Sequence, residues 1–225
     1  QSTTVNLNFQ SSNELMKIEV DNFMIKTENV VLPFINNIYS DFFETYDINT
    51  DKWYAEDVSN SLRSEKGKLI FENSNSNARL NFQTVLDGDF DVQVDMENLV
   101  WTNPSSGNQY SILGIDFDAN TYMTLQRGAS SDVDEYQYYL VQNGQVIDSN
   151  TISVSSFGYP SKLRIIRKNN NLYAYLWDGS WRLIKETLNA NLPQQSTTVN
   201  LNFQSSNELM KITVDNFVIN TDNVV

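Results

Sequence analysis

Apolar and polar residues alternate with a period of two along most of the chain. In the segment 90–96, Phe90, Val92, Val94 and Met96 alternate with acidic and amide residues. Such alternation is typical of a β-strand that buries one face. Further segments with strand character lie at 68–72, 78–82, 110–117, 122–126, 136–141, 145–147, 162–167, 172–177 and 182–185. Many short strands at regular spacing predict an all-β fold, a β-sandwich of two antiparallel sheets.

Turn-forming residues separate these segments. Asn143-Gly144 predicts a two-residue hairpin turn, because both residue types accept the positive φ angles that such a turn requires. Asp178-Gly179 predicts a second tight turn. No segment keeps a period of 3.6 over three turns, so we expect at most one short helical turn, within 40–49.

A long internal repeat divides the chain. Residues 1–31 return at 195–225, an offset of 194, with 27 of 31 positions identical. The four differences are Glu19 against Thr213, Met24 against Val218, Lys26 against Asn220, and Glu28 against Asp222. The pattern of apolar positions is therefore the same in both copies.

Each copy contains two alternating segments with the turn formers 11–14 or 205–208 between them. This arrangement predicts a β-hairpin with one apolar and one polar face. In the second segment of the first copy, the apolar residues stand at even positions from Met16 to Val20 and then at odd positions, at Phe23 and Ile25. A bulge or bend at Asp21-Asn22 would explain this parity shift. The apolar residues of the first copy, which we expect to dock by strand addition, are Val5, Leu7, Phe9, Met16, Ile18 and Val20.

The repeat suggests how the chain is organised. Residues 32–225 read as one complete unit, and residues 1–31 read as the terminal hairpin of a preceding repeat. The alternative is a single domain that duplicated its last hairpin. We expect one sandwich over 38–219, and docking of the first hairpin either on the same chain or on a neighbour. The residues of the second copy that we expect in the core are Val199, Leu201, Phe203, Ile212 and Val214.

Composition excludes several classes of function. The 225 residues include 15 Lys and Arg against 28 Asp and Glu, a formal charge of −13, which disfavours nucleic acid and anionic membrane surfaces as partners. The chain has no Cys and no His, so thiol chemistry, imidazole bases and typical zinc sites are excluded. No apolar run approaches the roughly 20 residues that membrane insertion requires. Tandem duplication is common in surface proteins, so we expect an extracellular or cell-surface location.

The later part of the unit resembles a known family. The stretch 163–175 followed by Trp177-Asp-Gly-Ser-Trp181 is similar to the late strands of laminin-G-like domains in the concanavalin A-like lectin/glucanase superfamily. Three further marks agree, at 40–43 with 51–53, at 89–94 and at 214–217. The resemblance implies a jelly-roll β-sandwich of the concanavalin A-like type.

Glucanases of that superfamily use a Glu-x-Asp-x-Glu strand, which the chain lacks. The nearest patterns are Asp91, Asp95 and Glu97 on one strand, and the acids of 132–135. Because the intervening residues of 90–96 supply a core face, we interpret the acids of that strand as a solvated outer face. The expectation is that the chain is not an enzyme.

Acidic and amide residues also suggest a metal site. Asp116, Asp118 and Asn120 stand at alternate positions, like the opening of a calcium loop, although the sixth-position Gly and twelfth-position Glu are missing. The alternative interpretation is a polar turn between two strands. The family resemblance suggests Asp41 as another ligand. No cofactor is required, and calcium is the ion that such oxygen ligands would bind.

Glycan binding needs aromatic platforms beside polar groups. The candidates are Trp101, Tyr110, Tyr136 and Tyr138, with a core or cross-strand role as the alternative for the tyrosines. Our main hypothesis is a structural and adhesive repeat module that associates with other copies of itself by strand addition, with glycans as further partners. The second is a carbohydrate-binding module attached to an enzyme elsewhere in the parent chain, and a glucanase is the third.

Overall fold

The structure is a computed structural model that describes residues 37–45, 47–101, 107–130, 133–154, 162–193 and 196–224. The described residues form fifteen β-strands and no helix. The strands are β1 (Asn37–Asp41), β2 (Trp53–Glu56), β3 (Leu62–Glu65), β4 (Lys68–Asn73), β5 (Ser76–Phe82), β6 (Leu86–Val100), β7 (Gln109–Asp118), β8 (Thr121–Ser130), β9 (Val133–Gln142), β10 (Gln145–Ser153), β11 (Lys162–Lys168), β12 (Asn171–Trp177), β13 (Trp181–Thr187), β14 (Thr198–Ser205) and β15 (Met210–Val224).

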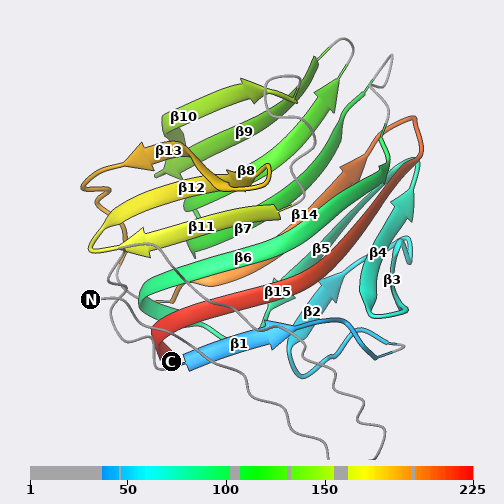
Figure 1. Cartoon of the computed structure of the whole chain (residues 1–225), viewed down its shortest axis with the longest axis horizontal. Coiled ribbons are helices and arrows are strands. Elements are labelled where there is room, and N and C mark those ends of the chain that lie inside the picture. Colours follow the sequence, from blue (N-terminus) through cyan, green and yellow to red (C-terminus); the bar gives the residue numbers. More distant parts are fainter. Residues whose placement is uncertain are drawn as a thin grey trace, which may run out of the picture. The chain divides into compact units, whose positions relative to one another are not determined.

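The strands are arranged in two antiparallel sheets (Figure 1). The eight-stranded sheet has the order β13-β12-β11-β6-β15-β4-β3, and β1 pairs with β15 in the same sheet. The seven-stranded sheet has the order β10-β9-β8-β7-β14-β5-β2. Non-consecutive strands are neighbours in both sheets, as in a jelly roll. The predicted fold class is confirmed.

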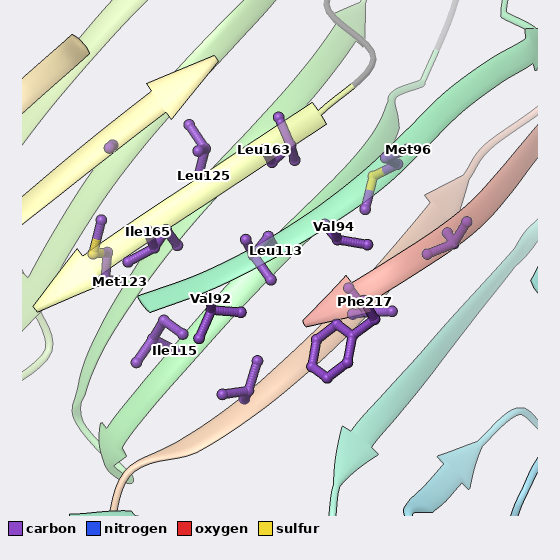
Figure 2. Packing of buried hydrophobic residues seen from close by; sticks show 14 of the residues in the cluster. Val92, Val94, Met96, Leu113, Ile115, Met123, Leu125, Leu163, Ile165 and Phe217 are labelled. Carbon is purple, nitrogen blue, oxygen red and sulfur yellow. The ribbon is translucent and has the colours of Figure 1, made fainter. Parts of the chain in front are cut away.

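A hydrophobic core fills the space between the sheets. Alternate residues of β6 and β7, among them Val92, Val94, Leu113 and Ile115, are fully buried there. Figure 2 shows these side chains together with Phe217 of β15. The alternation that predicted the strands also determines the core, because a sandwich strand buries every second side chain.

The second copy of the repeat supplies a central strand to each sheet. β14 lies between β7 and β5, whereas β15 lies between β6 and β4 (Figure 1). The predicted core residues Val199, Leu201, Phe203, Ile212 and Val214 are all fully buried, which confirms their placement. The prediction of a hairpin is wrong for this copy, since its two strands belong to different sheets.

The first copy, with Val5, Leu7, Phe9, Met16, Ile18 and Val20, lies outside the described residues. The corresponding bulge is described in the second copy. The register of β15 against β6 shifts between Asp215 and Val218, and Asn216 has a φ of 49°. The bulge rotates the strand so that Phe217 also faces the core, which accounts for the parity shift.

Two local features follow from turn-forming residues. Asn143 and Gly144 have φ angles of 51° and 76°, so the predicted two-residue turn between β9 and β10 is confirmed. The sequence allows at most one short helical turn in 40–49, and none is found among the described residues of that segment. The stretch after β1 is shaped instead by Asp41, whose carboxylate accepts a hydrogen bond from the backbone N–H of Phe43.

The acidic residues of β6 lie on the outer face of the eight-stranded sheet, but they are not simply solvated. Asp91 is 2% exposed and accepts two hydrogen bonds from Arg164, at 2.8 and 2.6 Å. Asp95 accepts two from Lys162, at 2.8 and 2.7 Å. The neighbouring strand β11 supplies both cations through its register with β6. Cross-strand pairing therefore replaces the solvation predicted for Asp91 and Asp95, whereas Glu97 is exposed as predicted.

Candidate functional site

The outward face of the seven-stranded sheet carries a set of mutually bonded polar side chains. Because Leu113 and Ile115 of β7 point into the core, the alternate residues Ile112, Gly114 and Asp116 point outward. The antiparallel register aligns each of them with outward residues on the adjacent strands. We call this surface the polar face. Its aligned residues are Asn81, Asn200, Thr124 and Tyr139 beside Gly114, and Arg79, Asn202, Gln126 and Gln137 beside Ile112.

One half of the polar face is a network of charged and amide groups on β2, β5, β7 and β14. Arg79 forms an ion pair with Asp116, and its Nε donates a hydrogen bond of 2.8 Å to Asn81 Oδ1. Asn200 Nδ2 donates to Asp116 Oδ2 at 3.1 Å. Asn81 Nδ2 in turn donates to Glu56 Oε1 at 2.8 Å. The network fixes the orientations of side chains from four strands. Its polar groups are therefore preorganised before a ligand binds.

Asp116 occupies an electrostatically unusual position on the central strand of this network. Burial raises the pKa of its carboxyl group, and the charge of Arg79 with the hydrogen bonds from Arg79 and Asn200 only partly opposes the rise. A carboxyl group with a raised pKa keeps its proton to a higher pH than an ordinary aspartic acid does. In its protonated form the group donates a hydrogen bond as well as accepting one.

The other half of the polar face is formed by β7, β8 and β9. Gln126 Nε2 donates to Gln137 Oε1 at 2.8 Å. The ring of Tyr110 lies against Gly128, since a Cβ built there would be 2.8 Å from a ring carbon. Burial, followed by the neighbouring phenol of Tyr139, raises the pKa of Tyr110. The absent side chain at Gly128 thus allows the Tyr110 ring to lie close to the sheet.

Gly114 provides the space for Asn200 at the centre of the face. A Cβ at this position would lie 2.4 Å from the Oδ1 atom of Asn200, which is closer than any real contact. A larger residue would displace the amide and with it the hydrogen bond to Asp116. Small residues in a central strand often mark a close approach of other groups.

The structure does not bring the four predicted glycan-binding residues together. Tyr110 lies on the polar face, but Tyr136 and Tyr138 point inward and belong to the core cluster. Tyr138 forms a hydrogen bond of 2.8 Å with Thr187, and burial raises its pKa to about 12. Neither ring can stack on an external ligand. Trp101 is partly buried against the core, with the guanidinium carbon of Arg127 at 4.5 Å from its ring centre.

The proposed metal ligands are also dispersed. Asp116 is paired with Arg79, whereas Asp118 accepts a hydrogen bond of 2.7 Å from the backbone N–H of Asn120, which forms the polar turn. Asp41 accepts hydrogen bonds from Phe43 and from Trp53 Nε1, the latter at 2.7 Å. Within the described ranges, no group of three or more acidic side chains is arranged to hold a metal ion. Calcium binding stays a prediction.

Most residues of the polar face were missed at the sequence level. Arg79, Asn81 and Asn200 are separated along the chain, and only the register of β5, β7 and β14 brings them together. The available signal was the alternation itself, because polar residues between buried ones must point outward. The alternation cannot show which outward residues become neighbours.

No family model and no curated protein matches the sequence. Solved structures do match the fold. The carbohydrate recognition domain of Emp47p aligns with a TM-score of 0.61 at 12% identity, covering 82% of this chain and 96% of that one. LamA from Zobellia galactanivorans, solved with laminaritriose and laminaritetraose, aligns with a TM-score of 0.57 at 14% identity, over 83% of this chain and 100% of that one. The β-glucanase of Bacillus licheniformis aligns with a TM-score of 0.55 at 15% identity, over 83% and 98%.

These similarities correct one expectation from the sequence. The prediction that the chain is not an enzyme is contradicted, because its structural neighbours include a β-glucanase and the Crh5 transglycosylase. The missing Glu-x-Asp-x-Glu pattern is therefore no basis for excluding catalysis.

The described residues include no helix long and apolar enough to cross a membrane. At these identities the comparisons establish the architecture: the chain is a jelly-roll sandwich with the concanavalin A-like lectin/glucanase fold.

Proposed function

We propose that the chain binds carbohydrate on the polar face of its seven-stranded sheet. The observation that carries this proposal is the network that joins Arg79, Asn81, Asn200 and Asp116 across three adjacent strands. Sugar hydroxyls both donate and accept hydrogen bonds, and amide side chains do the same. A network that is already oriented loses little entropy when it exchanges partners with such a ligand.

Aromatic rings complete the recognition surface. Tyr110 lies beside Gly128, and the outward phenol of Tyr139 is close enough to influence it. Tyr54 extends the face on β2 and is 61% exposed. Tyrosine rings can cover the apolar C–H surface of a sugar while the hydroxyl group remains hydrated. The combination of rings and amides therefore suits a glycan better than a peptide or a lipid.

The charges of the face favour an uncharged glycan. The Arg79 cation is neutralised by Asp116, and Glu56 and Glu135 add negative charge at outward positions. The whole chain carries a formal charge of −13. A sulfated or uronic acid polysaccharide would be repelled, whereas a neutral one would not. The neighbours named above support a carbohydrate ligand, because one is a carbohydrate recognition domain and another was solved with oligosaccharides.

Binding to glycans would fit an adhesive role. The duplicated 31-residue segment and the laminin-G-like resemblance support a domain that is repeated within a larger extracellular protein, where each copy could contribute one weak site. Several weak sites on one chain give strong overall attachment without any new contact. Multivalent display of the polar face is the form of adhesion that we propose.

The test is a binding measurement with the whole chain and a panel of neutral glycans that includes laminaritetraose, with dextran sulfate as the charged comparison. Tyr110→Ala and Asn200→Ala should each weaken binding at least tenfold, which corresponds to about 1.4 kcal/mol. Tyr173→Ala, on the outward face of the other sheet, is the matched control and should leave affinity unchanged. The proposal fails if no neutral glycan binds, or if the control loses as much affinity as the other two variants.

The same incubations also address catalysis. Soluble products should be analysed by mass spectrometry, since glycoside hydrolases share this fold. Release of shorter oligosaccharides that is lost in Asp116→Asn would extend the proposal from binding to hydrolysis. The raised pKa of this carboxyl group is a property that a general acid requires.

A further inference from the structure

The second repeat copy occupies a defined space in the sandwich. β14 is hydrogen-bonded to β7 and β5 in one sheet, and β15 is hydrogen-bonded to β6 and β4 in the other (Figure 1). We call the space that these two strands fill the completion slot. If it were empty, both sheets would be divided at their centres, because each strand has neighbours on both sides. The sandwich therefore depends on this one segment more than on any edge strand.

Residues 1–31 carry the same core-facing residues as the segment in the slot. Every buried apolar position of β14 and β15 has an identical counterpart in the first copy. The pairs are Val199 and Val5, Leu201 and Leu7, Phe203 and Phe9, Met210 and Met16, Ile212 and Ile18, Val214 and Val20, Phe217 and Phe23, and Ile219 and Ile25. Packing in the core consequently cannot distinguish one copy from the other.

Three of the differences between the copies, at Thr213, Val218 and Asn220, affect residues of β15 that alternate with its core positions. Thr213 donates a hydrogen bond of 3.4 Å to Glu97, so the Glu19 of the other copy would meet a like charge there. Asn220 is the cross-strand partner of Asp91, where Lys26 would add a cation. The slot should thus accept both copies and prefer its own copy at the Thr213 position, because paired like charges destabilise a sheet.

We infer that residues 1–31 of one molecule can replace β14 and β15 in a second molecule, so that the protein associates by exchange of a central strand pair. The occupant is a second copy of this chain, because every molecule carries a spare segment that matches the slot. This mode differs from the strand addition expected from the sequence, in which a hairpin extends an existing edge. The exchange is heterologous, so successive molecules form an open chain unless the geometry closes it.

The first test uses matched substitutions in the two copies of the full chain. Phe203→Asp places a charge in the core and should displace the molecule's own segment, because a buried charge without a partner is strongly unfavourable. We expect this variant to retain a cooperative thermal transition and to sediment as assemblies of more than one chain. Phe9→Asp leaves the molecule's own segment intact but spoils the segment that it would donate, so this variant should keep the transition and form no assemblies by exchange. The double variant should lose the transition.

The second test supplies the segment separately. A synthetic peptide of residues 1–31 should restore the transition of the double variant Phe9→Asp/Phe203→Asp, and the same peptide with Phe9→Asp should not. A peptide carrying Glu19→Thr should restore it at lower concentration, because it removes the like charge beside Glu97. The inference is overturned if neither the peptide of residues 1–31 nor its Glu19→Thr form restores the transition. It is also overturned if Phe203→Asp alone unfolds the chain, or if that variant folds but remains monomeric at every concentration. The tests involve no glycan, so they are independent of the proposed function.

Discussion

Replacing Asp41 should show whether this carboxylate stabilises the sandwich or holds a metal ion. Asp41 is only 7% exposed, and it accepts hydrogen bonds from the backbone N–H of Phe43 and from Trp53 Nε1, at 2.8 and 2.7 Å. Phe43 has a φ of 49°, a conformation that a large residue adopts only when its surroundings impose it. Trp53 packs against Phe43, Phe82 and Phe217. The carboxylate therefore orients a buried aromatic cluster between the sheets.

The structure gives the size of the expected effect. A hydrogen bond to a charged group contributes about 1.5 to 3 kcal/mol, and Asp41→Ala removes two such bonds while leaving the indole N–H buried without its partner. We expect the free energy of unfolding to fall by about 3 to 5 kcal/mol, a large part of the stability of a typical domain. Asp41→Asn keeps a neutral acceptor and should lose less, about 1 to 3 kcal/mol.

Urea unfolding followed by tryptophan fluorescence and far-UV circular dichroism measures this loss. Asp118→Ala is a matched control, because Asp118 also accepts a hydrogen bond from the backbone N–H two residues later, but at an exposed site. The control should leave the free energy of unfolding close to that of the unmodified chain, because its site is exposed. A loss below 1 kcal/mol in Asp41→Ala would refute the reasoning. A loss that appears only with added calcium, and not with a chelator, would make Asp41 a metal ligand.

Three further changes test other parts of the structure. The pKa of Asp116 is raised in the folded chain, so its contribution to stability is complete below the unfolded pKa near 3.8 and is lost as pH rises through the folded pKa. The free energy of unfolding of Asp116→Asn, measured by urea titration at several pH values, should therefore rise relative to that of the unmodified chain as pH increases. Gly114→Ala should displace Asn200, weaken glycan binding and cost about 1 to 3 kcal/mol in unfolding experiments; an unchanged affinity would contradict the packing at this position. Arg167→Met should preserve or raise the melting temperature, because burial lowers the pKa of Arg167 and two of its guanidinium nitrogens have no hydrogen-bond partner among the described residues; a clear decrease would show that the cation contributes to stability.

The alternation of apolar and polar residues is sufficient to predict the class of fold and much of the core. Val199, Leu201 and Phe203 are buried as expected, since a sandwich strand has only two faces and one must be apolar. The same alternation cannot say which sheet a strand joins. Two apolar segments separated by a turn are compatible with a hairpin in one sheet or with a connection between two sheets, and β14 and β15 form the second arrangement.

The polar face was less predictable for a related reason. Its network depends on neighbours in space, such as Arg79 and Asp116, which lie on β5 and β7 with β14 between them. Trp101 and Tyr138 were selected as ligand platforms because they are aromatic, yet both contribute to packing. Composition identifies the residue types of a binding surface, whereas the register of the strands determines which of them face the same side.

The two proposals meet in β14. This strand places Val199, Leu201 and Phe203 in the core, and it places Asn200 in the network of the polar face. The first repeat copy has the same alternation and carries Asn6, Asn8 and Gln10 at the positions of Asn200, Asn202 and Gln204. A strand pair donated by a second molecule would therefore restore the amides of the binding surface together with the core. Association by exchange would preserve one complete glycan-binding face in every sandwich, so an assembled chain of molecules would present a regular row of identical sites.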